Sequence, residues 1–267
     1  KGENNDVVTI TGKLANGVTH SVEVTVVAEE NPYAAYYAFW DFTNGEVENK
    51  TTAKNLVTNK NDSIISGVDG TESGYLTDQG LTLASGSVIN VPIADDMPGG
   101  IEIGLEMLLP VGKYNYDGMR NKAFLSLAKG TTNKMEIGTE KYGYAWPSIR
   151  GVYESGGNGE VTWRGATDSG GTALGNTAMW WSASTLHQHV RVRLNSSGGG
   201  EIAMRADSDK DWRTWKLPTY AGTEYKFPGF MSIKEACDTI LIANRVAKDG
   251  AVDGTILYNA YIKEYNG

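Results

Sequence analysis

Alternation of apolar and polar residues is the dominant pattern along the chain. In IEIGLEML, residues 101 to 108, apolar side chains occupy Ile101, Ile103, Leu105 and Met107. Other segments of the same kind are LTLASGSVINVPI, KAFLSLAKG, KMEIGTEKYG, HVRVRLNSSGGGEIAMRAD, DTILIANRV and TILYNAYIKEYN. A period of two residues indicates strands that bury one face and expose the other.

Turn and helix signals complete this pattern. Asp-Gly pairs, which favour tight turns, recur at 69–70, 117–118, 249–250 and 253–254. Only SIKEACD indicates a helix, because Ser232 and Glu235 have the spacing of a capping box. Many short strands with almost no helix predict an all-β protein, a two-sheet antiparallel β-sandwich.

The first 30 residues are predicted to form a separate β-hairpin. VVTITGKLANGVTHSVEVTVV, residues 7–27, alternates around Asn16-Gly17, a pair that suits a two-residue turn. A lone hairpin is marginally stable in water, so we expect it to pack on another element or to end a domain. It resembles the last two strands of immunoglobulin-like domains in bacterial surface proteins. Residues 1–30 are therefore interpreted as the C-terminal fragment of such a domain, and residues 33–267 as the sandwich.

Four segments, in order, resemble the concanavalin A-like lectin/glucanase superfamily, particularly its LamG-like jelly rolls. AFWDFTNGEVEN is similar to the family's first strand and acidic loop, and LTLASGSVINVP to its next strand. LHQHVRVRLNSSGGGEIAMRAD is similar to a Trp-His-His-Val hairpin, although Leu186 and Gln188 depart from it. ILIANRV with DGTILYNAYIKEYN is similar to the paired closing strands. The resemblance implies a jelly roll with one convex and one concave sheet. Residues 142–185, rich in Gly, Trp and Tyr, are expected to be long loops or an insertion.

Function does not follow from this resemblance, because the superfamily includes lectins, glycosidases, polysaccharide lyases, calcium-dependent adhesion modules and inert spacers. Composition argues against some classes of partner. The net charge is −8 and no basic cluster occurs, which argues against a nucleic-acid partner. No apolar run approaches the roughly 18 residues of a membrane span. Cys237 is the only cysteine, which excludes a disulfide scaffold and a cysteine metal site.

The start of the chain bears on location. The chain begins with the polar stretch KGENND, without a signal sequence. Either a signal peptide or lipoprotein anchor has been removed, or the protein is cytoplasmic. Because the hairpin resembles the end of a domain whose start is missing, we expect the first, a secreted or cell-surface bacterial protein.

Glu102 and Glu106 are the candidate catalytic residues. On a strand their Cα atoms would lie about 13 Å apart, at ~3.3 Å per residue. Their side chains could bring the carboxyl groups to the roughly 5–5.5 Å of a retaining glycosidase. The segment resembles the laminarinase-type motif Glu-apolar-Asp-apolar-Glu, but Gly104 replaces the aspartate that, in that family, helps set the protonation states of the pair. The alternative, which we favour, is that both glutamates lie on the solvent-exposed face of an ordinary sheet and have no catalytic role.

Histidines on the predicted 186–207 hairpin are a candidate metal site. His187 and His189 are two residues apart, so both point to one face of a strand and could bind a metal. The third histidine, His20, is distant in sequence, and the family resemblance implies structural histidines here. No metal site is assigned.

Arginines extend the same face. Arg191 and Arg193 follow the histidines, Arg205 could join from the partner strand, and Glu201 could neutralise them in a cross-strand pair. The stripe could bind an acidic sugar. A solvated face with salt bridges is the favoured interpretation.

Aromatic residues in glycine-marked loops are the preferred ligand-binding residues. The chain has 7 Trp and 14 Tyr against 5 Phe. Trp and Tyr stack on the C–H face of a sugar ring while flanking polar groups bind its hydroxyls. The alternative is that these rings close the edges of the sandwich. The candidate set is Tyr142, Tyr144, Trp146, Trp163, Arg164, Trp212, Arg213 and Trp215.

The combined expectation is a non-catalytic carbohydrate-binding or adhesion module that contacts a polysaccharide or a glycoprotein glycan. No cofactor is predicted, although Asp41, Asp249 and Asp253 could hold a structural calcium ion if they are not ordinary turn aspartates. Two alternatives stay open. One is a retaining glycosidase or polysaccharide lyase that uses Glu102 and Glu106, and the other is a structural or protein-binding spacer.

Overall fold

The computed structural model divides the chain into two compact units, residues 1–34 and residues 35–267. It describes residues 7–25, 31–43, 47–48, 52–58, 60–66, 76–77, 80–110, 122–139, 147–154, 158–164, 186–196, 200–206, 212–217, 219–220, 223–224, 232–246 and 250–267.

The first unit contains the expected hairpin. Strands β1 (Val7–Lys13) and β2 (Thr19–Thr25) pair antiparallel, and Gly17 adopts a positive φ of 83° in the turn. Val8 lies opposite Val24 and Ile10 opposite Val22. These four side chains are 42 to 61% exposed. The relation of this hairpin to an immunoglobulin-like domain stays a prediction.

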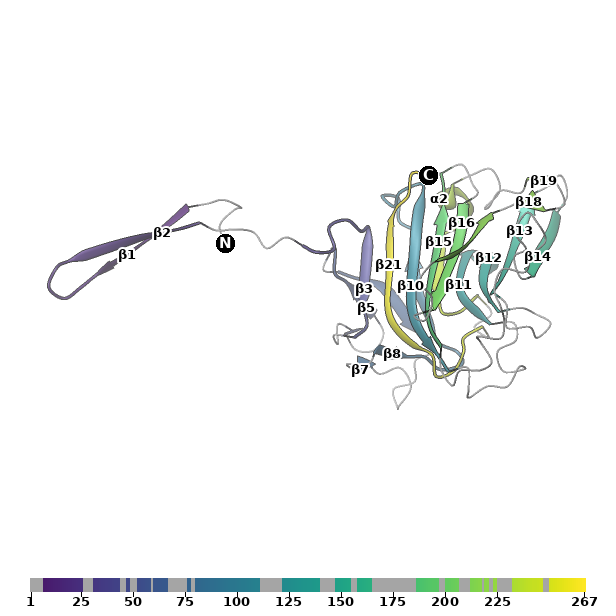
Figure 1. Cartoon of the computed structure of the whole chain (residues 1–267), viewed down its shortest axis with the longest axis horizontal. Helices are drawn as coiled ribbons and strands as arrows, with labels where there is room; N and C mark the ends of the chain where they lie inside the picture. The colour runs from purple at the N-terminus through teal and green to yellow at the C-terminus, as the bar shows by residue number, and fades with distance from the viewer. Residues whose placement is uncertain are drawn as a thin grey trace. The chain divides into compact units, whose positions relative to one another are not determined.

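The second unit is a sandwich of two antiparallel sheets (Figure 1), which confirms the predicted all-β fold. In the first sheet the order is β17 (Arg213–Leu217), β16 (Gly200–Ala206), β15 (Leu186–Leu194), β10 (Ile101–Leu109), β21 (Ile256–Glu264), β8 (Gly80–Thr82) and β7 (Leu76–Thr77), and β3 (Ala38–Asp41) also pairs with β21. In the second sheet it is β14 (Asn158–Arg164), β13 (Pro147–Glu154), β12 (Thr132–Thr139), β11 (Ala123–Lys129), β20 (Thr239–Ile242), β9 (Val88–Pro92), β6 (Lys60–Ser66), β5 (Thr52–Asn55) and β4 (Val47–Glu48). Strands β18 (Thr219–Tyr220) and β19 (Thr223–Glu224) form a small separate ladder.

The core lies between the two large sheets. The burial predicted from the alternation in β10 is confirmed: Ile101, Ile103, Leu105 and Met107 are all buried. They share one apolar cluster with side chains from the second sheet, among them Ile89, Leu125, Ile137 and Ile240. Because successive residues of a strand point to opposite faces, this packing directs the polar residues of β10 away from the core.

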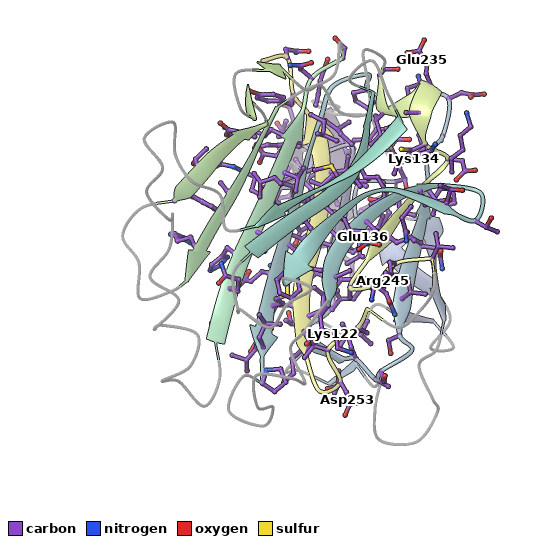
Figure 2. The ribbon with its side chains drawn as sticks, turned by 90° about the vertical axis from the view of Figure 1, so that its right-hand side faces the viewer. Lys122, Lys134, Glu136, Glu235, Arg245 and Asp253 are labelled. Carbon is purple, nitrogen blue, oxygen red and sulfur yellow. The ribbon has the colours of Figure 1, made fainter. Side chains whose placement is uncertain are left out.

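The second unit contains a buried ion pair on the second sheet and a capped helical turn. Glu136 on β12 and Arg245 form a buried ion pair of 3.2 Å and point toward one another in Figure 2. The predicted helix is present as one turn, α2 (Ile233–Ala236). The Glu235 carboxylate accepts the backbone N–H of Ser232 at 2.8 Å, which is the predicted capping interaction.

Residues 142–185, expected to be long loops or an insertion on the sandwich, contain two described strands. β13 and β14 lie in this region and extend the second sheet beyond β12. Their pairing uses backbone groups, which do not require the side-chain alternation that was missing from the sequence. Residues 141–146, 155–157 and 165–185 lie outside the described part of the chain.

Candidate functional site

The outer side of the first sheet carries a continuous group of charged, polar and aromatic residues, called here the polar face. It is contributed by β10, β15, β16 and β21, whose other side packs into the core. Register places neighbouring members opposite one another: Glu102 lies between Arg193 and Lys263, and Glu106 between His189 and Asn259. The polar face comprises Glu102, Glu106, His187, His189, Arg191, Arg193, Glu201, Arg205, Asn259, Tyr261 and Lys263.

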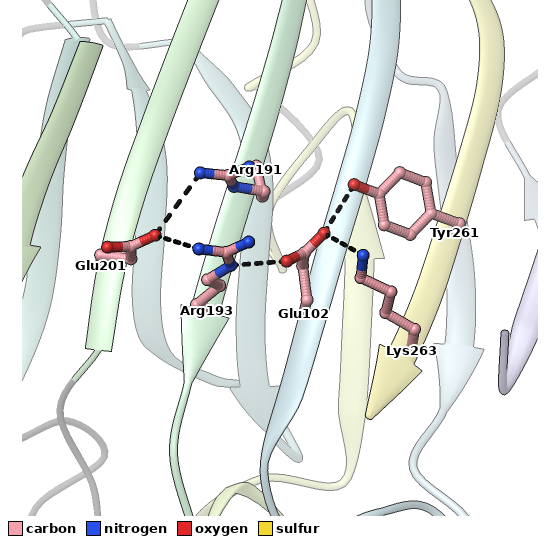
Figure 3. Close-up of polar contacts among 6 residues, drawn as sticks. All are labelled: Glu102, Arg191, Arg193, Glu201, Tyr261 and Lys263. Carbon is pink, nitrogen blue, oxygen red and sulfur yellow. Dashed lines mark hydrogen bonds and ion pairs between the residues drawn. The ribbon is translucent and has the colours of Figure 1, made fainter. Parts of the chain in front are cut away.

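Glu102 is the most buried member of this face, with 2% of the residue exposed. Its carboxylate accepts hydrogen bonds from Arg193 Nε at 2.5 Å and from the Tyr261 hydroxyl at 2.8 Å. It also forms an ion pair with Lys263 Nζ at 3.1 Å (Figure 3). Burial alone would raise the pKa of Glu102, but these three donors outweigh it and lower the pKa. Glu102 is thus held as a carboxylate.

The charges of the polar face alternate across three adjacent strands. Glu201 on β16 accepts Arg193 Nη1 at 2.7 Å and Arg191 Nη2 at 3.5 Å, while Arg193 also binds Glu102. Figure 3 shows these groups in one row across the sheet. The row confirms the interpretation of Arg191 and Arg193 as part of a salt-bridged face, and Glu201 is the neutralising partner that the sequence indicated.

Gly104 faces Tyr261 on the neighbouring strand. A Cβ atom on Gly104 would lie 2.1 Å from two ring carbons of Tyr261, so the ring occupies the space of the absent side chain. The ring is further packed by Tyr36, at 5.2 Å between centroids, and by Phe39. Burial and the nearby Glu102 carboxylate raise the pKa of Tyr261 well above its ordinary value. Sequence reasoning missed Tyr261, because only the register of β10 and β21 reveals it.

Glu106 is the centre of a second cluster on the polar face. Its Oε1 lies 2.8 Å from His187 Nε2, and its Oε2 accepts a hydrogen bond from Asn259. His187 stacks on His189 with ring centroids 5.1 Å apart. Potential ligand atoms of Glu106, His187 and His189 all lie within 4.8 Å of one another. The structure therefore joins a candidate catalytic carboxylate to the two candidate metal-binding histidines.

A β-bulge lies beside this second cluster. The pairing of β10 with β21 shifts between Glu106 and Met107, which leaves Tyr258 without an opposite residue on β10. The carbonyl of Tyr258 instead accepts the backbone N–H of Phe42 at 2.8 Å, and its ring lies 5.1 Å from that of His187. Bulges commonly re-aim side chains next to functional sites. Tyr258 and Asn259 were also missed from the sequence.

Trp212, a member of the predicted aromatic set, lies at the polar face. The guanidinium carbons of Arg191 and Arg205 lie 4.5 and 5.4 Å from the centre of its ring system. His189 meets it edge-on at 6.3 Å. The ring is half-buried. The Nε atoms of Arg191 and Arg205 are buried and have no hydrogen-bond partner among the described residues.

Four other candidate binding residues lie on edge strands. Arg213 and Trp215 belong to β17, at an edge of the first sheet, while Trp163 and Arg164 belong to β14, at an edge of the second. Tyr142, Tyr144 and Trp146 fall outside the described residues. Their part in a binding site stays a prediction.

The candidate calcium ligands show turn chemistry where the structure describes them. Asp41 Oδ1 accepts the backbone N–H of Thr43 at 2.8 Å and its hydroxyl at 2.6 Å, which is the behaviour of a turn aspartate. Asp253, labelled in Figure 2, lies in the turn before β21, and Asp249 is outside the described part. Within the described ranges neither Asp41 nor Asp253 belongs to a group of three potential metal ligands.

Comparisons with known proteins reach only distant similarities. No protein-family model matches the chain, and no curated protein matches its sequence. Domain 4 of the extracellular arabinanase AbnA from Geobacillus stearothermophilus, solved with arabinotriose, is 11% identical with a TM-score of 0.47, over 86% of this chain and 92% of that one. Tailspike protein 2 of Escherichia coli O157:H7 bacteriophage CAB120 is 12% identical with a TM-score of 0.48, over 78% of this chain and 25% of that one.

Trypanosoma rangeli sialidase is similar at the same level. It is 10% identical with a TM-score of 0.45, over 89% of this chain and 32% of the sialidase chain. This chain therefore spans about a quarter to a third of the tailspike and sialidase lengths. Similarities this distant assign neither a family nor a function. In the part of the chain that the structure describes, no helix is long and apolar enough to cross a membrane.

Proposed function

We propose that residues 35–267 form a non-catalytic carbohydrate-binding module that contacts a polysaccharide or glycoprotein glycan at the polar face, beside Trp212. The observation that carries this proposal is the surrounding of Trp212: a half-buried indole with two guanidinium groups within 5.4 Å and an imidazole at its edge. The two guanidinium groups lie over the ring, so a sugar would pack its C–H patch on the part of the indole that they leave open and turn its hydroxyl rim toward these donors.

Unsatisfied donors support a ligand at this place. The buried Nε atoms of Arg191 and Arg205 lack acceptors among the described residues, and an unmade hydrogen bond of a buried charged group costs free energy. A hydroxyl or carboxylate oxygen bound next to Trp212 could supply such an acceptor. As the sequence indicates, we place the module on an exported bacterial protein.

Catalysis by Glu102 and Glu106 is the weaker alternative. A general acid in a retaining glycosidase needs a raised pKa, whereas three donors lower the pKa of Glu102. Glu102 is also nearly inaccessible, and the Tyr261 ring covers Gly104 between the two glutamates. Glu106 is in turn bound by His187 and Asn259. These contacts suit a fixed polar surface better than a reacting pair.

The test is a binding screen of the whole chain against plant and host polysaccharides, neutral and acidic, by glycan array and affinity electrophoresis. We expect micromolar-to-millimolar binding to at least one glycan class, without release of reducing ends. Absence of binding by folded protein, established by circular dichroism, contradicts the proposal. Release of reducing ends would favour the catalytic alternative instead.

A further inference from the structure

The cluster of Glu106, His187 and His189 has a donor set suited to a metal ion. The chain has 3 histidines, and two of them lie here beside a carboxylate. We propose that these three side chains bind one divalent transition-metal ion of the zinc class. The argument for a metal ion does not rest on the proposed carbohydrate-binding function, although His189 also contacts Trp212.

The geometry is close to that of a bound site. Zn–N and Zn–O bonds are about 2.0–2.2 Å long, so two ligand atoms on one tetrahedral ion lie roughly 3.0–3.5 Å apart. His187 Nε2 and Glu106 Oε1 are already 2.8 Å apart, and the ligand atom of His189 is within 4.8 Å of both. Closing this gap needs a movement of about 1–2 Å by side chains that are only half-buried.

Antiparallel pairing brings the three residues together. Glu106 and His189 are directly opposite in the register of β10 and β15, and His187 lies two residues along on the same face. A strand pair in the middle of a sheet is a rigid support, because both neighbours, β21 and β16, hold it by further ladders. Sites built on strands are held more precisely than sites built on loops.

Surrounding residues orient the ligands as outer-shell groups do in metal sites. Asn259 donates to Oε2 of Glu106 and leaves Oε1 directed to His187. Tyr258, displaced by the bulge, packs against the ring of His187, and Trp212 meets the ring of His189. Glu106 thus has a hydrogen-bonded neighbour, and each histidine has an aromatic ring beside it.

The donor chemistry selects the ion. Two imidazoles and one carboxylate suit Zn²⁺, Cu²⁺, Ni²⁺ or Co²⁺, whereas Ca²⁺ and Mg²⁺ prefer sites made of oxygen ligands. Three protein ligands leave at least one coordination position for water or another ligand. The single thiol does not compete, since burial raises the pKa of Cys237 to about 12 and keeps it a neutral, inaccessible group.

The first experiment measures metal binding by the whole chain after removal of any histidine tag. Isothermal titration with ZnCl₂ should give one site, while CaCl₂ and MgCl₂ should give no heat of binding. His187→Gln, His189→Gln and Glu106→Gln should each abolish or strongly weaken the site. Asn259→Ala should weaken it by about tenfold, the usual effect of losing an outer-shell partner. His20→Ala, in the exposed hairpin, is the matched control and should leave affinity unchanged.

A second measurement uses only the wild-type chain, so it does not require that any variant folds. Electron paramagnetic resonance of the wild-type chain with one equivalent of Cu²⁺ should show hyperfine coupling to two nitrogen nuclei. Cu²⁺ bound at the cluster should also quench tryptophan fluorescence, because Trp212 lies against His189. The proposal fails if Zn²⁺ does not bind, if binding survives in the His187→Gln/His189→Gln double variant, or if His20→Ala removes it. Those results would leave the three side chains as a hydrogen-bonded cluster only.

Discussion

The ring of Tyr261 lies across the backbone of Gly104 on the adjacent strand. An ideal Cβ on Gly104 would be 2.1 Å from two ring carbons and 2.5 Å from the hydroxyl oxygen. That hydroxyl donates to Glu102 at 2.8 Å. Gly104 is therefore the position that allows Tyr261 to reach Glu102. The ring takes the place of the middle carboxylate whose absence distinguishes IEIGLEML from the laminarinase-type motif.

Substitution of Gly104 tests this packing. Gly104→Ala should displace the Tyr261 ring, break its hydrogen bond to Glu102 and lower the free energy of unfolding by about 1–3 kcal/mol, the usual cost of overpacking. Urea denaturation measures the change. Gly86→Ala is the control, because a Cβ there meets no atom within 4 Å. In a Tyr261→Ala background the cost at Gly104 should disappear, and an undiminished cost would mean that the ring is not its cause.

The sequence predicts which residues of β10 face the core and which face outward, but not the residues of neighbouring strands that contact them. Period-2 alternation placed Ile103 and Leu105 in the core and Glu102 outside it, because alternation follows from the geometry of a single strand. The contact between Gly104 and Tyr261 depends on the register of strands 157 residues apart in sequence, as the pairing shows. No local pattern encodes that register. For the same reason, the sequence does not predict the contact of Asn259 with Glu106.

A different limit applied to the second sheet. Strands β13 and β14 have weak alternation in a stretch rich in glycine, so no apolar face indicated them. Their pairing to β12 and to one another is the evidence for them in the structure. Residue type alone identifies the candidate aromatic residues in the sequence, whereas the environment of Trp212 depends on Arg191 and Arg205, which the fold brings to its ring.

Loss of the Glu102 charge should destabilise the first sheet. Glu102→Gln leaves Arg193 and Lys263 without their common carboxylate, and hydrogen bonds to charged groups contribute about 1.5–3 kcal/mol each in a buried setting. We expect a decrease of that order in the free energy of unfolding at neutral pH. Glu201→Gln is the comparison: it removes a more exposed partner of Arg193 and should cost about 1 kcal/mol or less. Equal costs for the two variants would contradict a special role for Glu102.

Acid should remove the contribution of Glu102. Its folded-state pKa is lowered by Arg193, Tyr261 and Lys263 despite burial, so the folded protein binds this proton less readily than the unfolded chain. The stabilisation is therefore fully present above the unfolded pKa of about 4.3 and is lost as the pH falls through the folded pKa. The difference in unfolding free energy between wild type and Glu102→Gln should shrink below about pH 4.3. A difference that is constant from pH 7 to pH 3 would disprove this linkage.

High pH should lower the stability of the folded protein through ionisation of Tyr261. Burial and the Glu102 carboxylate raise its pKa, so the unfolded chain loses the hydroxyl proton first. The sign is opposite to that of Glu102: stability is fully present below the unfolded pKa of about 10 and falls as the pH rises above it. Tyr261→Phe should lose the hydrogen bond at neutral pH but show a smaller decline in stability above about pH 10. Absorbance titration of phenolate should show one fewer late-titrating tyrosine in that variant.

Trp212 should carry a large share of glycan affinity. Trp212→Ala removes the stacking surface and the ring that Arg191 and Arg205 approach, so affinity should fall about tenfold or more, or ~1.4 kcal/mol. Trp212→Phe retains an aromatic face and should keep part of the affinity. Affinity electrophoresis with a glycan identified in the screen measures both, and thermal unfolding confirms that each variant is folded. If Trp212→Ala binds as the wild type does, the ligand contacts another surface, and the proposed site at the polar face is wrong.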